Sequence, residues 1–182
     1  MSEPIIPKYI FFTKGVGRHK DKLWSFELGL RDAGIAPFNL VKVSSIMPPG
    51  CEIIAREEGL KMIKPGQILH CVAIRNSTNK EGELISSAVG LAAPEDTTKY
   101  GYLSEHSAIG KTEEETSKYA EEHAASMLAA SKGTDFDPEK AWDKKKQIYE
   151  MDGKPVKTHS MAQSAKGKKD IWTTIGVAAI MI

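Results

Sequence analysis

The pattern of apolar and polar positions predicts a protein built mostly from strands. The run YIFFT at 9–13 is rich in β-formers and predicts a strand, and the KGVG that follows predicts a loop. Further strands are predicted over the ranges 38–45, 67–75, 83–93, 100–106, 156–165 and 171–182. The PPG at 48–50 closes the strand 38–45, because proline cannot donate a ladder hydrogen bond.

Two segments have helical spacing instead. The first runs over 21–33 and is followed by Gly34, a residue suited to end a helix. Its apolar positions are Leu23, Phe26, Leu30 and Ala33. The second runs over 112–131, where Thr112 and Glu115 form a capping box ahead of an apolar face. The polar stretch 133–155 predicts a surface excursion with at most one short helix.

The order of these elements indicates the fold class. A strand, a helix, several strands, a helix and more strands predict an α/β (α+β) sandwich, in which helices pack on mostly antiparallel sheet. The strict alternation of a doubly wound parallel fold is missing, and no GxGxxG or Walker loop indicates a nucleotide cofactor. With 182 residues, the chain is expected to form a single domain over 1–182.

Charge and cysteine content exclude several kinds of partner. Lys and Arg number 25 against 24 Asp and Glu, so we expect neither nucleic acid nor a membrane surface as a partner. Cys51 and Cys71 lack the spacing of a zinc or redox site, and we expect both to be reduced and buried. The N-terminus lacks a secretory pattern, and the apolar stretch 171–182 is too short to span a bilayer. We therefore expect a cytoplasmic protein.

The stretch VSSIMPPG at 43–50 is the strongest candidate for chemistry. No metal-ligand spacing and no GxSxG elbow occur, and we expect no metal site. Serine also favours turns, so an adjacent serine pair before two prolines has a purely structural interpretation. Glu105 and His106 form a possible acid–base pair, although such pairs are usually an exposed strand end, and His123 is more typical of a packing histidine.

Several segments resemble the pyruvoyl-dependent arginine decarboxylases. NLVKVSSIMPPG at 39–50 is similar to the segment in which that family cleaves its own chain. The resemblance extends to FELGLRDAGI, ELISSAVGLAAP and GYLSEHSAIGKTEEE, and so to nearly the whole chain except 133–155. It implies a four-layer αββα sandwich and a homo-oligomer, a trimer or a hexamer, with active sites between neighbouring subunits.

The resemblance also implies a cofactor made from the chain itself. The Ser45 hydroxyl would attack the carbonyl carbon of Ser44 and convert the peptide bond into an ester. Elimination and hydrolysis would leave a β chain of residues 1–44 and an α chain of residues 45–182. The α chain would begin with a covalent pyruvoyl group derived from Ser45, so neither pyridoxal phosphate nor a metal is expected.

Family roles can be carried over to matching positions. Asn39 would donate a hydrogen bond to the developing oxyanion or to the substrate, and Ser44 would lie in the substrate site. Glu105 would supply the proton after decarboxylation. Glu27 would bind the arginine guanidinium, although the family has an aspartate there and glutamate is one methylene longer. Most helix carboxylates, including nearby Asp32, simply face solvent.

The expected reaction is therefore conversion of L-arginine to agmatine and carbon dioxide, an entry point to polyamines. Two alternatives stay open. The first is a pyruvoyl-dependent decarboxylase of another amino acid such as histidine, because Glu27 can also pair with an imidazolium. A second alternative is an unprocessed, non-catalytic relative that binds a cationic metabolite or builds an oligomer.

Overall fold

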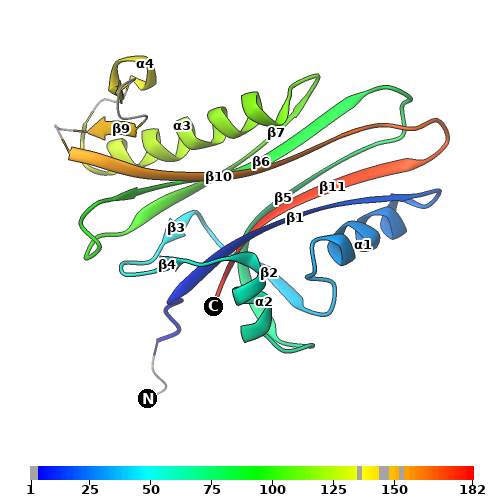
Figure 1. The fold of residues 1–182 in the computed structure, drawn as a ribbon, viewed down its shortest axis with the longest axis horizontal. Coiled ribbons are helices and arrows are strands. Elements are labelled where there is room, and N and C mark those ends of the chain that lie inside the picture. The colour runs from blue at the N-terminus through cyan, green and yellow to red at the C-terminus, as the bar shows by residue number, and fades with distance from the viewer. Residues whose placement is uncertain (1–3, 135–136, 144–147, 152–153) are drawn as a thin grey trace.

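Two mostly antiparallel β-sheets face each other in the computed structural model, and helices cover both outer faces (Figure 1). The structure describes residues 4–134, 137–143, 148–151 and 154–182. The first sheet has the strand order β2-β5-β11-β1-β4, and the second has the order β3-β7-β6-β10-β9-β8. Helices α1 and α2 lie on the first sheet and α3 lies on the second, so the predicted four-layer αββα sandwich is confirmed.

The strands of the first sheet are β1 (Tyr9–His19), β2 (Asn39–Lys42), β4 (Glu52–Ile53), β5 (Ile68–Thr78) and β11 (Trp172–Met181). The antiparallel pair of β1 and β11 runs from Ile10↔Met181 to His19↔Trp172. In contrast, the short strands β2 and β4 run parallel to β5 and β1. The first and last strands, β1 and β11, are therefore neighbours inside this sheet, and β2 lies at its edge.

The strands of the second sheet are β3 (Ile46–Met47), β6 (Leu84–Pro94), β7 (Gly101–Ile109), β8 (Trp142–Asp143), β9 (Ile148–Met151) and β10 (Lys154–Lys166). Strand β6 pairs antiparallel with β10 on one side and with β7 on the other. The two-residue strand β3 pairs antiparallel with β7 and forms the edge. The sheets' edge strands β2 and β3 are therefore neighbours in sequence.

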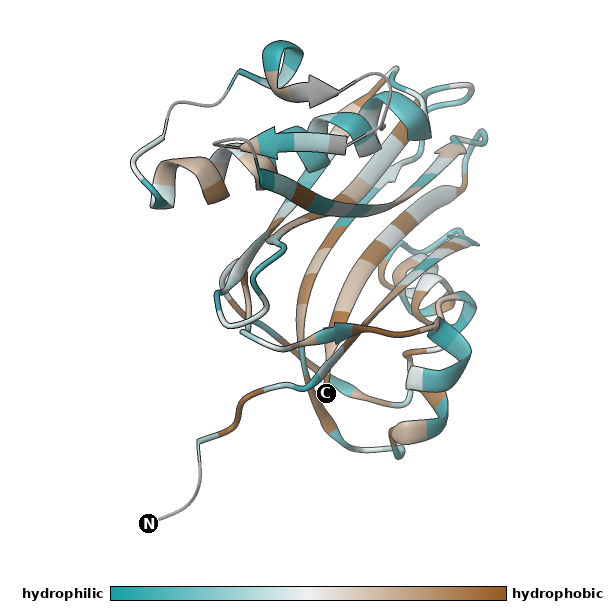
Figure 2. Ribbon diagram, turned by 60° about the vertical axis from the view of Figure 1, so that its left-hand side comes forward, coloured by the Kyte–Doolittle hydropathy of each residue, from teal (hydrophilic) through white to brown (hydrophobic). Residues whose placement is uncertain are grey.

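The core between the sheets is built from alternate strand positions, as expected for a sandwich. It contains the buried residues Ile10, Phe12, Met47, Cys51, Val72, Val89, Leu91, Leu103, Val177, Ala179 and Met181. Figure 2 shows that the hydrophobic positions follow the strands, whereas the helices carry long hydrophilic stretches. A separate cluster around Phe11 and Leu69 packs beneath α1 and α2 on the outer face of the first sheet.

Helix α1 (Lys22–Asp32) begins after Asp21, whose side chain accepts a hydrogen bond from the Trp24 N–H. The predicted bounds are confirmed, and so is most of the predicted apolar face, since Ala33 is buried and Phe26 and Leu30 are half-buried. Leu23 is the exception at 73% exposed, and the helix also buries Ser25 and Gly29, which the apolar pattern does not reveal.

Strand β1 continues through the KGVG that was predicted as a loop. Gly15 and Gly17 are paired with β11 and lie directly under α1. A Cβ atom on Gly17 would come 1.9 Å from the Ser25 carbonyl oxygen, and one on Gly15 would come 2.2 Å from that of Gly29. These glycines belong to the strand because they let the helix backbone approach it closely.

Helix α3 (Glu113–Ser131) confirms the predicted capping box of Thr112 and Glu115. Its buried residues are Thr116, Ala120, Ala124, Ala125, Leu128 and Ala129. The predicted excursion 133–155 contains α4 (Pro138–Ala141), β8 and β9, and part of it lies outside the described residues. It is not only a surface segment, because Tyr149 and Met151 are buried against α3. This burial raises the pKa of Tyr149 to about 12.

Helix α2 was not predicted from the sequence. Helix α2 (Arg56–Met62) is seven residues long, and Ala55, which precedes it, makes no side-chain cap. Its Gly59 sits against the Phe11 ring, where a Cβ atom would come within 2.2 Å. A short helix without a cap signal, held by a tertiary contact to a distant residue, leaves little pattern in the sequence.

Candidate active site

The Ser44–Ser45 peptide bond lies where the chain crosses from one sheet to the other. Lys42 is the last residue of β2 in the first sheet, and Ile46 is the first residue of β3 in the second. The predicted strand 38–45 therefore ends three residues early, because the two sheets diverge here and no strand can pair with both. Ser44 is exposed and Ser45 is half-buried, so the bond sits at the rim of the sandwich.

Backbone hydrogen bonds fix the chain on both sides of this bond. Before it, the Val43 N–H donates to the Cys71 carbonyl of β5 at 3.0 Å. After it, the Ser45 carbonyl accepts from the Leu103 N–H of β7 at 2.7 Å. Each sheet thus holds one side of the Ser44–Ser45 bond, and the prolines that follow limit how far the chain can relax.

The bond also forms part of a tight turn. The Ile46 N–H donates to the Ser44 carbonyl oxygen at 3.0 Å, a three-residue turn centred on Ser45. Positive φ among the described non-glycine residues is confined to Asp170, so Ser45 has negative φ and the turn is of the inverse γ type. The Ser44 carbonyl, which Ser45 is predicted to attack, therefore already accepts a hydrogen bond.

Glu105 lies on β7 two residues beyond the Leu103 contact. Leu103 is fully buried between the sheets, and side chains two apart on a strand share a face, so Glu105 follows it at the rim. Its Oε1 atom lies 3.1 Å from the Lys42 Nζ atom, with the two side chains 35% and 59% exposed. The structure thus brings Glu105 next to the strand that leads into Ser44.

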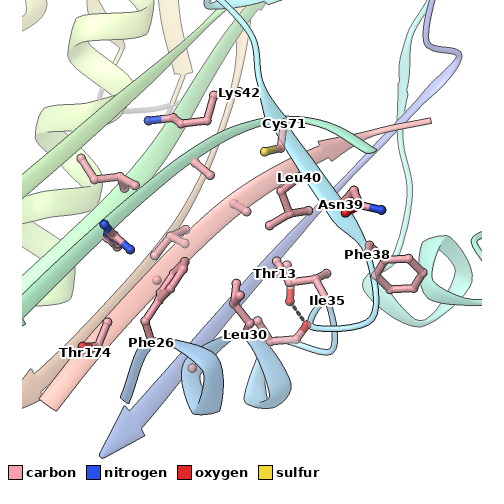
Figure 3. Close-up of a pocket in the computed structure, with 18 residues that line it drawn as sticks. Thr13, Phe26, Leu30, Ile35, Phe38, Asn39, Leu40, Lys42, Cys71 and Thr174 are labelled. Atoms are coloured by element: carbon pink, nitrogen blue, oxygen red, sulfur yellow. Dashed lines mark hydrogen bonds between the residues drawn. The ribbon is translucent and has the colours of Figure 1, made fainter. Parts of the chain in front are cut away.

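Asn39 is not brought to the Ser44–Ser45 bond. It begins β2, three residues before Lys42 at the strand's end, and Figure 3 shows the two side chains at opposite ends of the strand. Its Nδ2 atom donates to the Gly66 carbonyl at 3.0 Å. Within a single chain, this amide is therefore engaged with the loop before β5 rather than with the Ser44 carbonyl. The roles of Asn39 toward the oxyanion and the substrate stay predictions.

A groove of about 670 Å³ runs along the outer face of the first sheet beside α1 (Figure 3). Asn39 and Lys42 line one side of it, and Phe26 and Leu30 of α1 line the other. The Arg75 guanidinium lies over the Phe26 ring, 4.5 Å from its centroid. The groove offers apolar walls with polar groups at its margin, the usual composition of a small-molecule site.

Glu27 lies on α1 beside this groove but is not among the residues that line it. Its Oε1 atom accepts from the Arg31 Nε atom at 3.0 Å, an i,i+4 ion pair on the helix surface. Asp32 is exposed, as expected, and its Oδ2 atom also accepts from the Val16 N–H at 2.8 Å. Within a single chain, Glu27 is thus paired with Arg31, whereas Glu105 is paired with Lys42.

Cys51 and Cys71 are both free and buried, as predicted. Burial raises the pKa of the Cys51 thiol to about 11. Burial also raises the pKa of Cys71, while Lys42 lowers it and Glu105 raises it. Protonated thiols are poor nucleophiles, so neither cysteine competes with Ser45 for the chemistry.

Two of the histidines, His106 and His123, contact Tyr119 of α3. His106 points to the α3 side, where its ring lies 4.1 Å from that of Tyr119, and Tyr119 stacks on His123 at 4.5 Å. Burial lowers the pKa of His106, and the neighbouring His123 lowers it further. No group of three or more metal-ligating side chains occurs in the described ranges. None of the helices described there is long and apolar enough to cross a membrane.

Comparison with known proteins identifies the class of protein to which this sandwich, with its serine pair between the two sheets, belongs. Residues 9–182 match the family model described as pyruvoyl-dependent arginine decarboxylase. The chain is 54% identical over 177 residues to a probable pyruvoyl-dependent arginine decarboxylase of Chlorobaculum parvum, covering 97% of this chain and 98% of the relative. It is 50% identical over 179 residues to pyruvoyl-dependent arginine decarboxylase 2 of Methanosarcina mazei, covering 98% of each chain. The chain therefore belongs to the pyruvoyl-dependent arginine decarboxylase family, which confirms the resemblance seen in the sequence.

Two features of the site were missed by the sequence analysis. Lys42 carries no motif of its own, and its partner Glu105 lies 63 residues away in sequence. The Ile46 N–H is a backbone group, which side-chain motifs cannot reveal. The prolines at 48 and 49 gave no signal for this turn, because they follow β3 and the chain leaves the first sheet already at Lys42.

Proposed function

We propose that this chain converts L-arginine to agmatine and carbon dioxide with a pyruvoyl group made from its own Ser45. One observation supports this proposal above the others. The Ser44–Ser45 bond spans the two sheets at an accessible rim, and its carbonyl already accepts a hydrogen bond. Membership of the pyruvoyl-dependent arginine decarboxylase family supports arginine as the substrate and decarboxylation as the reaction.

The residues at this position fit the cofactor. Ser45 supplies a β-hydroxyl, and its half-buried position at the rim leaves the new N-terminus of an α chain 45–182 open to substrate. The anchors of Val43 and of the Ser45 carbonyl lie on different sheets, so both new chain ends stay attached after cleavage. Once formed, the pyruvoyl ketone supplies an electron sink for the carbon that loses carbon dioxide.

Protein side chains supply the remaining functions in this proposal. Glu105 gives a proton to the α carbon after carbon dioxide leaves, since it projects at the same rim as Ser45. The groove beside α1 receives the apolar part of the arginine side chain, with Asn39 and Ser44 in contact with substrate. Glu27 of one subunit pairs with the guanidinium in a neighbouring subunit's site, since in its own chain it lies outside the groove and pairs with Arg31. A trimer or hexamer of cleaved units in the cytoplasm fits this arrangement.

Mass spectrometry of the purified protein tests the proposal. We expect residues 1–44 as one fragment and residues 45–182 as a second, beginning with a pyruvoyl group. Incubation with L-arginine should release agmatine, whereas the Ser45→Ala protein should stay at the full 20.0 kDa and release none. An intact wild-type chain would support an unprocessed binding protein instead. Turnover of histidine but not arginine would reassign the substrate.

A further inference from the structure

We infer that the backbone N–H of Ile46 stabilises the oxyanion formed during self-cleavage. This inference rests on the proposed function. The Ile46 N–H already donates to the Ser44 carbonyl oxygen at 3.0 Å, and this oxygen gains the negative charge when the Ser45 hydroxyl attacks. The donor is therefore aimed at the reacting atom before the reaction begins.

The chemical step is an acyl shift from nitrogen to oxygen. A bond forms between the Ser45 Oγ atom and the Ser44 carbonyl carbon, and the Ser44 C–N bond breaks. The hydroxyl proton ends on the Ser45 nitrogen, and the carbonyl oxygen is charged only in the tetrahedral intermediate. A hydrogen bond that strengthens with this charge lowers the barrier, whereas it contributes little to the stability of the resting chain.

The surrounding structure holds this donor in place. Ile46 is paired with Tyr102 and Met47 with Gly101, so the residues after the turn belong to a sheet. The Leu103 N–H fixes the Ser45 carbonyl, which is the other half of the Ile46 peptide unit. Because that carbonyl and the Ile46 N–H belong to one planar group, fixing the carbonyl also fixes the direction of the N–H. A donor that need not reorient is the kind that accelerates reactions most.

The side chain expected to fill this role is engaged elsewhere. Asn39 donates to the Gly66 carbonyl at the far end of β2. Moving this amide to Ser44 would break that bond. The γ-turn amide needs no such rearrangement, so the structure assigns the donor to the backbone of Ile46.

Replacing Ile46 by its α-hydroxy acid tests the inference, because this ester removes the N–H and keeps the side chain. Hydroxylamine cleaves esters but not amides, and it also cuts the introduced ester after residue 45. The acyl shift is therefore measured as the mass of the fragment that ends at Ser44, which differs from the fragment that ends at Ser45. We expect the shift to slow by about 10²- to 10³-fold, the usual effect of losing one oxyanion donor. The matched control is the same replacement at Gly50, whose N–H donates to the Thr97 carbonyl and contacts neither Ser44 nor Ser45.

Each outcome has a distinct meaning. A normal acyl shift in the Ile46 ester would overturn the inference, as would an equal slowing in the Gly50 ester. If Asn39→Ala slows the shift as much as the Ile46 ester, the donor is Asn39 instead. A wild-type chain that never cleaves refutes the proposed function rather than this step. Should the Ile46 ester not fold, hydrogen exchange in Ser45→Ala decides, since rapid exchange of the Ile46 amide would contradict the hydrogen bond.

Discussion

At the scale of single residues, Glu105 and Lys42 link the two sheets and also the two chains that cleavage would create. Lys42 belongs to residues 1–44 and Glu105 to residues 45–182, and their charged atoms lie 3.1 Å apart. An ion pair this exposed contributes only about 0.2–1 kcal/mol to stability. Its position beside Ser44 therefore points to a role in placing the Glu105 carboxylate.

For Glu105→Gln, we expect the turnover number for arginine to fall by about 10² or more, because an amide cannot replace a positioned acid. Self-cleavage should proceed normally, since the acyl shift occurs in the backbone of Ser44 and Ser45. Agmatine release and fragment masses measure the two steps separately. Glu58→Gln, an exposed carboxylate on α2, is the control for loss of a charge. Normal turnover in Glu105→Gln would remove this residue from the mechanism.

Lys42→Met should lower the turnover number by up to about tenfold, because it frees the Glu105 carboxylate to leave its position. The same change in the Glu105→Gln background should have no further effect, and Lys42→Arg should restore most of the activity. Lys111→Met is the matched control, since Lys111 is 58% exposed and pairs with Glu115 away from the site. Equal losses in both backgrounds would show that Lys42 acts independently of Glu105.

Glu27→Gln should weaken arginine binding and leave self-cleavage intact, because cleavage involves no guanidinium. Loss of a charge-assisted pair of roughly 1.5–3 kcal/mol corresponds to about ten- to a hundredfold in kcat/KM, seen mainly in KM. Asp32 is unsuitable as a control, since it binds the Val16 N–H, so Glu58→Gln serves again. Similar KM values for the two variants would assign the guanidinium to a different carboxylate.

At the scale of elements, the helices differ in how far the sequence reveals their packing. Helix α3 could be predicted well because its signals are local: a capping box and alanines at helical spacing. The packing of α1 could not, since it depends on Gly15 and Gly17 of a different element. Hydrophobic periodicity assumes that apolar side chains face the sheet. In α1, Ser25 and Gly29 are the fully buried positions of the helix.

Gly17→Ala tests this packing. We expect a loss of about 1–3 kcal/mol, or several degrees in Tm, because the new methyl group would meet the backbone of Ser25 and Gly29. Gly176→Ala is the control on β11, where the nearest atom to a Cβ is the Ile74 carbonyl oxygen at 3.9 Å. Thermal unfolding of the two proteins measures the difference. Equal melting temperatures would mean that α1 can shift outward at little cost.

The site was predictable only in part for a related reason. Ser44, Ser45 and Glu105 could be identified from motifs, and the structure places them at one rim of the sandwich. The crossing between sheets could not, because whether β2 and β3 share a sheet depends on partners β5 and β7 far along the chain. The engagement of Asn39 with Gly66 is likewise a tertiary contact, 27 residues apart, that no local pattern contains.

At the scale of the whole molecule, residues 1–44 are built into the first sheet rather than attached to it. Strand β1 lies between β11 and β4, and β2 pairs with β5. Ile10, Phe11 and Phe12 of β1 are buried, and each such side chain is worth about 1.5–3 kcal/mol. The two chains formed by cleavage would therefore be held together without a covalent bond.

We expect the cleaved protein to elute from native gel filtration with both chains in one peak. Its Tm should lie within a few degrees of the uncleaved Ser45→Ala protein, because cleavage removes no core contact. The chains should separate only in denaturant, when β1 leaves the sheet. Loss of the 1–44 fragment under native conditions would contradict this account of the sandwich.

The crossover between the sheets has a consequence for when the enzyme becomes active. The turn at Ser45 is anchored by Cys71 of β5 and Leu103 of β7, so its reactive geometry exists only after both sheets have assembled. We expect a nascent or misfolded chain, which lacks these anchors, to remain uncleaved. Cleavage would thus serve as a built-in quality check, and the cleaved fraction in a cell would record how many molecules had folded correctly.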